Sequence, residues 1–407
     1  MTGPEGAAHR KRHYHGPAVL GYGFRPFFLS AALWAAFAMA LWLAALADLI
    51  EIPGRFDAVD WHAHELLFGY LPAVVAGFLL TAIPNWTGRL PVTGRPLLLL
   101  VGLWWAGRAA VLLAAHLPSG LAAALDLLFL LTLLAVAGRE ILAGKNWRNL
   151  RLLVAVSLLF LGDLLFYLEA ADGVVGGYGL RLGLAAGLLL IMLIGGRIVP
   201  SFTRNWLAQR GAARLPAPFG RFDAGVILLS AVALTLWILR PLDAATGWAA
   251  LIAGALQLYR LLRWRPFQSG GEPLVWVLHL GYLFLPLGFG ALALALIGPP
   301  AWPPSAALHL WTAGAIGLMT LAVMTRASLG HAGRPLRATR PIQLIYLLAL
   351  GAALTRFLFG VWPGESGLLT LSALLWIAAF TLFLWVFAPL LARRERTLSA
   401  APAKQAR

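Results

Sequence analysis

The chain has 407 residues, of which 60% are hydrophobic and only 12% are charged, and its formal net charge is +16. A soluble domain carries about 25% charged residues, so this composition excludes an ordinary soluble protein and predicts a polytopic membrane protein. The absence of cysteine excludes disulfides, iron–sulfur clusters and covalent c-type haem attachment. Any metal must therefore be held by His, Met or carboxylate side chains.

Long apolar runs follow one another from residue 27 to residue 390. A helix that crosses the hydrocarbon core needs roughly 20 apolar residues, and this rule predicts an all-α bundle of twelve transmembrane helices. The predicted spans are 27–49, 62–84, 96–116, 120–142, 150–170, 178–200, 223–240, 246–263, 273–297, 304–326, 341–361 and 367–390. The chain then divides into a basic N-terminal segment (1–26), one transmembrane domain (27–391) and a basic tail (392–407).

The loops at the two ends of these spans differ strongly in basic residues. With the N-terminus inside, 26 Lys and Arg residues fall in inner loops and the termini, and only Arg55, Arg181 and Arg240 fall outside. Basic residues accumulate on the cytoplasmic side of membrane proteins, so we expect both termini to be cytoplasmic. The basic residues are spread loop by loop rather than gathered in one patch, so no nucleic-acid partner is expected.

The first polar motif within an apolar run is Trp61-His62-Ala63-His64-Glu65. Polar side chains at such a depth are costly unless they are paired, hydrated or bound to something. His62 and His64 point about 200° apart on a regular helix and cannot both face one partner. Glu65 is expected on the face of His62 and is a further candidate cofactor-binding residue. His116 ends the span at 96–116, where a solvent-facing role is favoured.

His309 lies about 8 Å inside the outer end of the span at 304–326. It shares a stripe with Thr312, Ala313 and Ile316. One hypothesis is a b-type haem held by His62 or His64 on one side and by His309 on the other, and the alternative is that these imidazoles hydrogen-bond to loops at the wet interface. Arg356, close to the outer end of its span, could pair with a haem propionate.

Other charges are also predicted to lie within the spans. Arg108 and Asp126 lie at similar outer depths on consecutive spans, which favours a structural ion pair. Asp163 has no obvious partner in the sequence.

A second histidine layer is predicted on the inner side, where His279 lies roughly 10 Å deep and His331 lies just beyond the end of the span at 304–326. One metal cannot easily take ligands from both layers, so two sites are more natural than one. His279 with Met319 and Met324 on the neighbouring span would suit copper, although Met is more often core filler.

Inner helix ends share a polar pattern of arginines with Ser, Thr and Asn. Such groups could bind an anion or a lipid head group, or could anchor the helices at the membrane surface. The candidate residues for an inner-face polar pocket are Arg25, Asn85, Arg197, Ser201, Arg204, Asn205 and Arg326.

Four stretches at inner helix ends, together with Trp61-His62-Ala63-His64-Glu65 and His309, resemble the NnrS family of bacterial membrane proteins over nearly the whole chain. The stretches are Gly23-Phe24-Arg25-Pro26-Phe27-Phe28, Pro84-Asn85-Trp86-Thr87-Gly88-Arg89, Arg197 to Trp206, and Arg326 to Arg334. The resemblance implies a twelve-helix inner-membrane protein that contains haem and copper and is linked to nitric oxide metabolism and nitrosative stress. It also implies nitric oxide or nitrosyl species and a membrane electron donor as partners.

The outer histidines are also similar in placement to the low-spin haem site of haem-copper oxidase catalytic subunits. The spans at 178–200 and 223–240 contain no histidine, whereas those enzymes carry copper ligands there, so a binuclear reductase centre is not expected. The alternative function is a twelve-span transporter for a small anion or metal complex. Against it, the two halves show no clear repeat, and the loop from Gly88 to Arg95 lacks the acidic residue of the major-facilitator signature. The sequence leaves open whether the protein is an enzyme and which residues would be catalytic.

Overall fold

The computed structural model describes residues 14–173, 176–299 and 302–393. Within these ranges every regular element is a helix, as the composition predicts. Residues 1–13 of the predicted basic N-terminal segment (1–26) and residues 394–407 of the predicted basic tail (392–407) lie outside the described residues.

Eleven helical segments are long and apolar enough to cross a membrane among the described residues. They are α2 (Phe24–Leu46), α3–η2–α4 (Ala58–Thr87), α5 (Arg95–Leu112), α6 (Leu121–Ala143), η4–α7 (Trp147–Ala171), α8–η5–α9 (Tyr178–Ala208), α10 (Arg221–Leu239), α12 (Pro273–Ile297), α13–η7–α14 (Pro304–His331), α15 (Arg340–Val361) and α16 (Ser366–Ala392). The remaining predicted span, 246–263, corresponds to α11 (Ala244–Leu262), which packs along α12 and carries the polar Gln257 and Arg260 on its buried face. The fold is an all-α polytopic membrane bundle.

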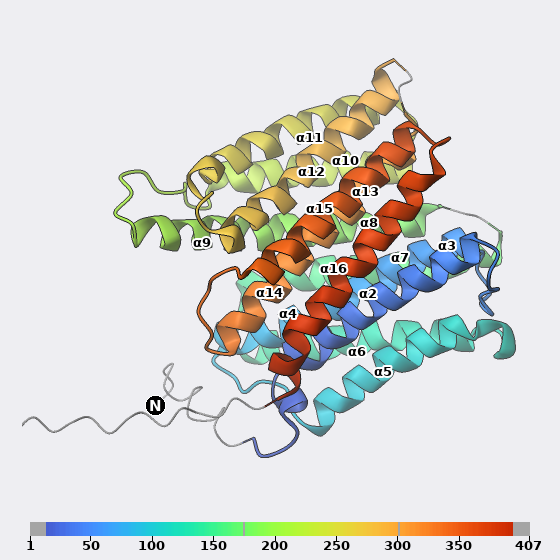
Figure 1. Cartoon of the computed structure of the whole chain (residues 1–407), viewed down its shortest axis with the longest axis horizontal. Helices are drawn as coiled ribbons and strands as arrows, with labels where there is room; N and C mark the ends of the chain where they lie inside the picture. Colours follow the sequence, from blue (N-terminus) through green and yellow to red (C-terminus); the bar gives the residue numbers. More distant parts are fainter. Residues whose placement is uncertain (1–13, 174–175, 300–301, 394–407) are drawn as a thin grey trace, which may run out of the picture.

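The helices run side by side along one common direction (Figure 1). The early helices α2 to α7 lie on one side and α10 to α12 on the other, while α14 to α16 lie across the front. Extensive contacts between α16 and α2 join the end of the described chain to its beginning. Arg25 at the start of α2 donates hydrogen bonds to the carbonyls of Leu390, Leu391 and Arg393 at the end of α16, so both ends of the described chain lie at one end of the bundle.

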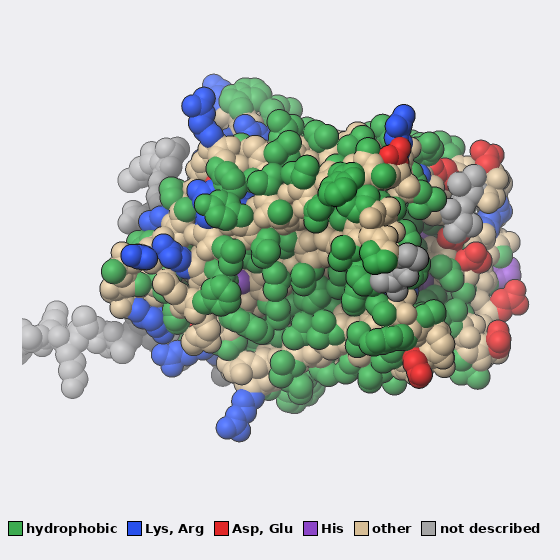
Figure 2. Space-filling view, turned by 90° about the horizontal axis from the view of Figure 1, so that it is seen from above, with side chains coloured by type: hydrophobic (Ala, Val, Ile, Leu, Met, Phe, Trp, Pro, Cys, Tyr) green, Lys and Arg blue, Asp and Glu red, His purple; other side chains and the backbone are tan. Residues whose placement is uncertain are grey.

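The two ends of the bundle carry opposite charge (Figure 2). Lys and Arg side chains gather at the end where the chain begins, and Asp and Glu side chains gather at the other. We call these the arginine-rich end and the acidic end. This separation agrees with the excess of Lys and Arg that the sequence analysis places in the inner loops.

Three of the long helices contain a π-helical stretch, in which the backbone takes a wider turn than in an α-helix. These stretches are η2 (Glu65–Tyr70), η5 (Ile191–Gly195) and η7 (Leu310–Leu318). Pro72 follows η2 and cannot donate the backbone hydrogen bond that the carbonyl of Phe68 would otherwise accept. The carbonyl of Met192 in η5 accepts a hydrogen bond from Arg260 Nη1 at 3.3 Å. Such stretches are frequent at functional sites, and η2 and η7 both border the cavity described below.

Helices α7 and α8 approach closely at glycines. A Cβ atom added at Gly162 of α7 would lie 2.6 Å from the backbone nitrogen of Gly183 and 3.0 Å from the carbonyl oxygen of Gly179. Backbone atoms cannot move aside as a flexible side chain can. Small residues therefore set the distance between these two helices, as is common in membrane proteins.

We predict that Gly162→Val destabilises the bundle by about 1–3 kcal/mol, the usual cost of overpacking. The measurement is equilibrium unfolding in mixed micelles. Gly102→Ala in α5 is the control, because nothing lies within 4 Å of a Cβ atom there. Equal stability of the Gly162 variant and the control would show that the two helices can separate without cost.

Candidate functional site

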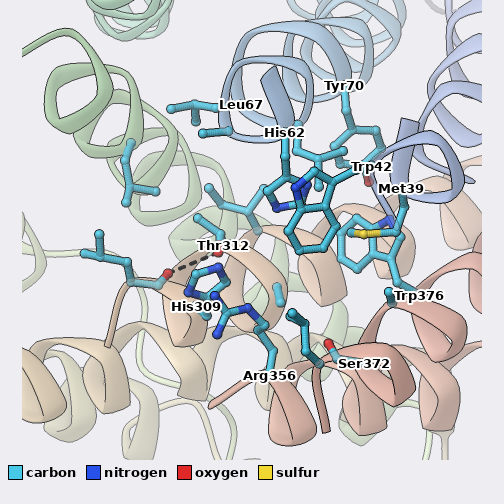
Figure 3. Close-up of a pocket in the computed structure, with 18 of the residues that line it drawn as sticks. Met39, Trp42, His62, Leu67, Tyr70, His309, Thr312, Arg356, Ser372 and Trp376 are labelled. Atoms are coloured by element: carbon cyan, nitrogen blue, oxygen red, sulfur yellow. Dashed lines mark hydrogen bonds between the residues drawn. The ribbon is translucent and has the colours of Figure 1, made fainter. Parts of the chain in front are cut away.

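A mostly apolar cavity opens between the helices near the acidic end of the bundle (Figure 3). It contains about 980 Å³ of space between atoms, counting its open mouth. Pockets for small molecules and cofactors are likewise lined mostly by apolar groups, with a few polar groups among them. The lining comes from α2, α3, η2, α8, α13, η7, α15 and α16, and its polar residues are His62, His309, Thr312, Arg356 and Ser372.

His62 enters this cavity from α3 (Ala58–His64), whose first turn is capped by Asp57. The Asp57 carboxylate accepts hydrogen bonds from the backbone nitrogens of Val59 and Asp60, at 2.9 and 2.8 Å. The imidazole of His62 stacks on the indole of Trp42, with ring centroids 4.0 Å apart. Neither ring nitrogen of His62 has a hydrogen-bond partner in the described part of the chain, so both are available to a ligand.

His309 enters the same cavity from α13 (Pro304–His309), more than 200 residues later in the chain. Its Nδ1 lies 3.0 Å from the carbonyl oxygen of Ser305. A carbonyl only accepts hydrogen bonds, so Nδ1 carries the proton and donates it, and a neutral imidazole keeps its lone pair on Nε2. This is the arrangement in which a protein fixes a histidine for metal ligation.

Arg356 of α15 also lines the cavity, beside His309 in Figure 3. Among the described residues no carboxylate lies within ion-pair distance of its guanidinium, which lies 5.3 Å from the ring centroid of Phe359. A half-buried guanidinium without a carboxylate partner can bind an anionic group of a ligand in a bidentate manner. The cavity can therefore hold a largely apolar ligand that combines a metal ion with an acidic group.

His64 does not face the cavity. It is fully buried on the other side of the same helix, where its Nδ1 lies 3.1 Å from Glu65 Oε1 and its Nε2 lies 3.1 Å from Asp163 Oδ1 and 3.2 Å from Asp126 Oδ2. The prediction that His62 and His64 face different partners is confirmed. The apparent lack of a partner for Asp163 in the sequence was misleading, because its partner is His64.

Glu65 lies with His64 rather than with His62, so the predicted sharing of a face with His62 is wrong. The cavity face of this helix is centred near Leu66 and Tyr70, whereas His64 and Glu65 are neighbours about 100° apart on the opposite half. The Glu65 carboxylate accepts hydrogen bonds from Arg108 Nη1 and from Trp34 Nε1, both at 2.6 Å. These donors hold it away from the cavity.

The predicted ion pair between Arg108 and Asp126 is confirmed. Asp126 also accepts a hydrogen bond from the hydroxyl of Tyr167 at 2.9 Å. A Cβ atom at position 69 would lie 2.5 Å from Arg108 Nη1 and 2.9 Å from Glu65 Oε2, so Gly69 leaves the space that the side chains of Arg108 and Glu65 occupy. We call Glu65, His64, Arg108, Asp126 and Asp163 the outer polar cluster.

The inner histidines lie apart from each other and from the cavity. His279 is buried, with Nε2 2.8 Å from Thr203 Oγ1 and with no partner for Nδ1. His331 is the last residue of α14 (Met319–His331) rather than lying beyond the helix, because this helix continues five residues past the predicted end. The ring of His331 packs near those of Tyr22 and Phe24.

The candidate residues of the inner-face polar pocket divide between two hollows. Arg197, Ser201 and Arg204 line one hollow with Asn146, Arg148 and Asn149. Asn85 and Arg326 line another, together with His331. Arg25 bonds to the end of α16, and Asn205 is exposed and borders neither hollow.

Sequence reasoning missed the convergence of Asp126 and Asp163 on His64. The available signal was that Arg108, Asp126 and Asp163 lie at similar depths in three successive spans. It also missed Trp34, Trp42 and Tyr167, because aromatic residues are common throughout such a chain.

We predict that Arg108→Ala destabilises the protein by about 3–5 kcal/mol, because it leaves buried carboxylates without their cation. Arg139→Ala is the control, since the Arg139 side chain is 69% exposed in its pair with Glu140 and such pairs contribute about 0–1 kcal/mol. Equilibrium unfolding in mixed micelles measures both variants. Equal losses for the two would contradict a cost from buried charge.

Comparison with known proteins supports one family assignment. A search of curated proteins and a search of solved structures each found no match. A family model described as "NnrS protein" matches residues 18–395, which is nearly the whole chain. The chain therefore belongs to the NnrS family.

Proposed function

We propose that the protein is a membrane haem protein that handles nitric oxide or nitrosyl species, by redox chemistry or binding, in defence against nitrosative stress. The observation that carries the proposal is the meeting of His62 and His309 at one apolar cavity, although the two residues come from distant parts of the chain. Membership of the NnrS family supports the link to nitric oxide.

The residues at the cavity fit a b-type haem. His62 and His309 would hold its iron, since His62 has no other hydrogen-bond partner in the described residues and the Nδ1–H of His309 is held by Ser305. Arg356 would pair with a propionate. Bound haem would supply one-electron redox chemistry.

The surroundings of the cavity support this role. Stacking on Trp42 holds the plane of the His62 imidazole. The lining residues Met39, Leu67, Leu184 and Ile316 give the cavity a largely apolar wall. An apolar lining also favours retention of a porphyrin over passage of a small anion, which argues against the transporter alternative.

The proposal includes a location in the bacterial inner membrane, with both termini in the cytoplasm. The arginine-rich end then faces the cytoplasm, in agreement with the positive-inside rule, and the cavity lies toward the outer face. A membrane electron donor would supply reducing equivalents to the haem.

We predict that His309→Ala lowers haem content by at least about tenfold, because it removes one of the two proposed ligands, and that His62→Ala does the same. Purified protein is measured by its Soret absorbance and by the pyridine haemochrome assay. His116→Ala is the control, because His116 is exposed at the same end of the bundle and does not line the cavity.

Full haem content in both cavity variants would falsify the proposed ligation. Native protein that contains no haem but carries anions across vesicle membranes would favour the transporter instead.

The proposal places copper, if the protein holds it, at His279. The buried Nδ1 of His279 has no hydrogen-bond partner within the described ranges, and imidazole nitrogen is a good copper ligand. We predict that His279→Ala lowers copper content measured by mass spectrometry while the Soret absorbance is retained. Equal loss of copper and haem would argue against separate sites, and unchanged copper content would exclude His279 as a ligand.

A further inference from the structure

The outer polar cluster lies on the opposite side of α3 from the cavity and serves no part of the haem proposal. Four helical segments of the bundle bring its members together: α3–η2 carries His64 and Glu65, α5 carries Arg108, α6 carries Asp126 and α7 carries Asp163. We propose that His64, Asp126 and Asp163 bind one divalent transition-metal cation, with Zn²⁺ as the best match. This inference does not depend on haem in the cavity.

The donor atoms are spaced as a metal requires. One ligand atom from each of the three side chains lies within 4.8 Å of the others. Ligands about 2.0–2.1 Å from a tetrahedral Zn²⁺ lie roughly 3.3 Å from one another. The observed distances from His64 Nε2 are 3.1 Å to Asp163 Oδ1 and 3.2 Å to Asp126 Oδ2, so small side-chain shifts would complete the geometry.

Glu65 orients the imidazole for metal binding. Its Oε1 lies 3.1 Å from Nδ1 of His64, so the imidazole can donate through Nδ1–H and offer the lone pair of Nε2 to the cation. Metal-ligating histidines commonly donate their other ring N–H to a carboxylate in this way. Glu65 is itself held by Arg108 and Trp34, which gives the ligand a fixed orientation.

The cluster without a cation leaves polar groups unsatisfied. A single N–H at Nε2 cannot point at both Asp126 and Asp163. Asp163 Oδ2 is buried and has no hydrogen-bond partner among the described residues, and the Asp163 side chain is fully buried. Since buried polar atoms are nearly always paired, this oxygen indicates a ligand that the protein alone does not provide.

Charge points to the same conclusion. Three carboxylates face one guanidinium in a buried setting, which leaves two formal negative charges when the imidazole is neutral. A divalent cation cancels both charges. Uncompensated charge inside a membrane protein is costly, so the balance favours a bound cation over an empty cluster.

The donor set selects the class of metal. One imidazole nitrogen and two carboxylate oxygens suit Zn²⁺ or Mn²⁺, whereas Cu⁺ prefers sulfur ligands. Three protein ligands leave a fourth position for water. Phe56, which is half-buried in the loop before α3, packs beside the ligand His64, with ring centroids 5.2 Å apart.

The first experiment uses the native protein. Full-length protein is stripped with a chelator and titrated with Zn²⁺ alone, followed by metal analysis after desalting. We expect one Zn²⁺ per chain and a rise in melting temperature on its addition. Co²⁺ in place of Zn²⁺ should give visible absorption bands typical of a four-coordinate site with oxygen and nitrogen ligands. Absence of stoichiometric Zn²⁺ binding by the native protein would overturn the proposal.

Two variants then locate the cation. Asp163→Asn should abolish stoichiometric Zn²⁺ binding, and Tyr167→Phe should weaken it about 10–100-fold, because Tyr167 donates to the ligand Asp126. Asp172→Asn is the matched control, since Asp172 is an exposed carboxylate that caps the same helix, α7 (Leu150–Ala171). Tyr167→Phe keeps the test valid if Asp163→Asn does not fold.

His62→Ala separates this cation from the cavity, and it should keep the Zn²⁺ while losing haem. Loss of Zn²⁺ in His62→Ala, together with full Zn²⁺ binding in Asp163→Asn, would overturn the assignment of the cation to the outer polar cluster. In the native protein, haem without stoichiometric Zn²⁺ would contradict only this inference, and stoichiometric Zn²⁺ without haem would contradict only the haem proposal.

Discussion

The structure depends on one constraint, which is that polar groups inside a lipid bilayer must find their partners within the protein. Most of the chain meets this constraint by being apolar. The segment from His62 to Glu65 does not, and its three polar side chains lie in two different environments. His64 and Glu65 lie in a buried network with Arg108, whereas His62 lies in a cavity beside Trp42. The same short helix therefore separates two chemical environments.

The wall between these environments is built from close contacts. Gly69 leaves room for Arg108 beside Glu65, and Gly183 of α8 packs against the ring of Phe68 on η2. The π-helical stretch that contains both Gly69 and Phe68 changes the turn of the helix between the cluster and the membrane centre. Tight packing on this side keeps the cluster dry, and the dry surroundings strengthen its electrostatic interactions.

Much of the fold could be predicted from the sequence, because hydrocarbon thickness sets the length of the apolar helices. The separation of His62 from His64 also followed from helix geometry alone. The position of Glu65 did not, since it depends on donors from α2 and α5 that no local pattern reveals. The same limit applied to Asp163, whose partner is 99 residues away in sequence. The inner-face residues were expected in one pocket, but packing of their helix ends divides them between two hollows.

The arrangement also limits how substitutions in this region can be interpreted. A change at His64 removes one partner each from Glu65, Asp126 and Asp163, so its first effect is on the packing of α3 against α6 and α7. Any loss at the cavity would then follow from movement of His62, two residues away. A change at His309 does not disturb contacts between helices in this way, because its described hydrogen bond is to the backbone of its own helix. His309 is therefore the cleaner probe of the cavity, and the outer cluster is best probed from α7.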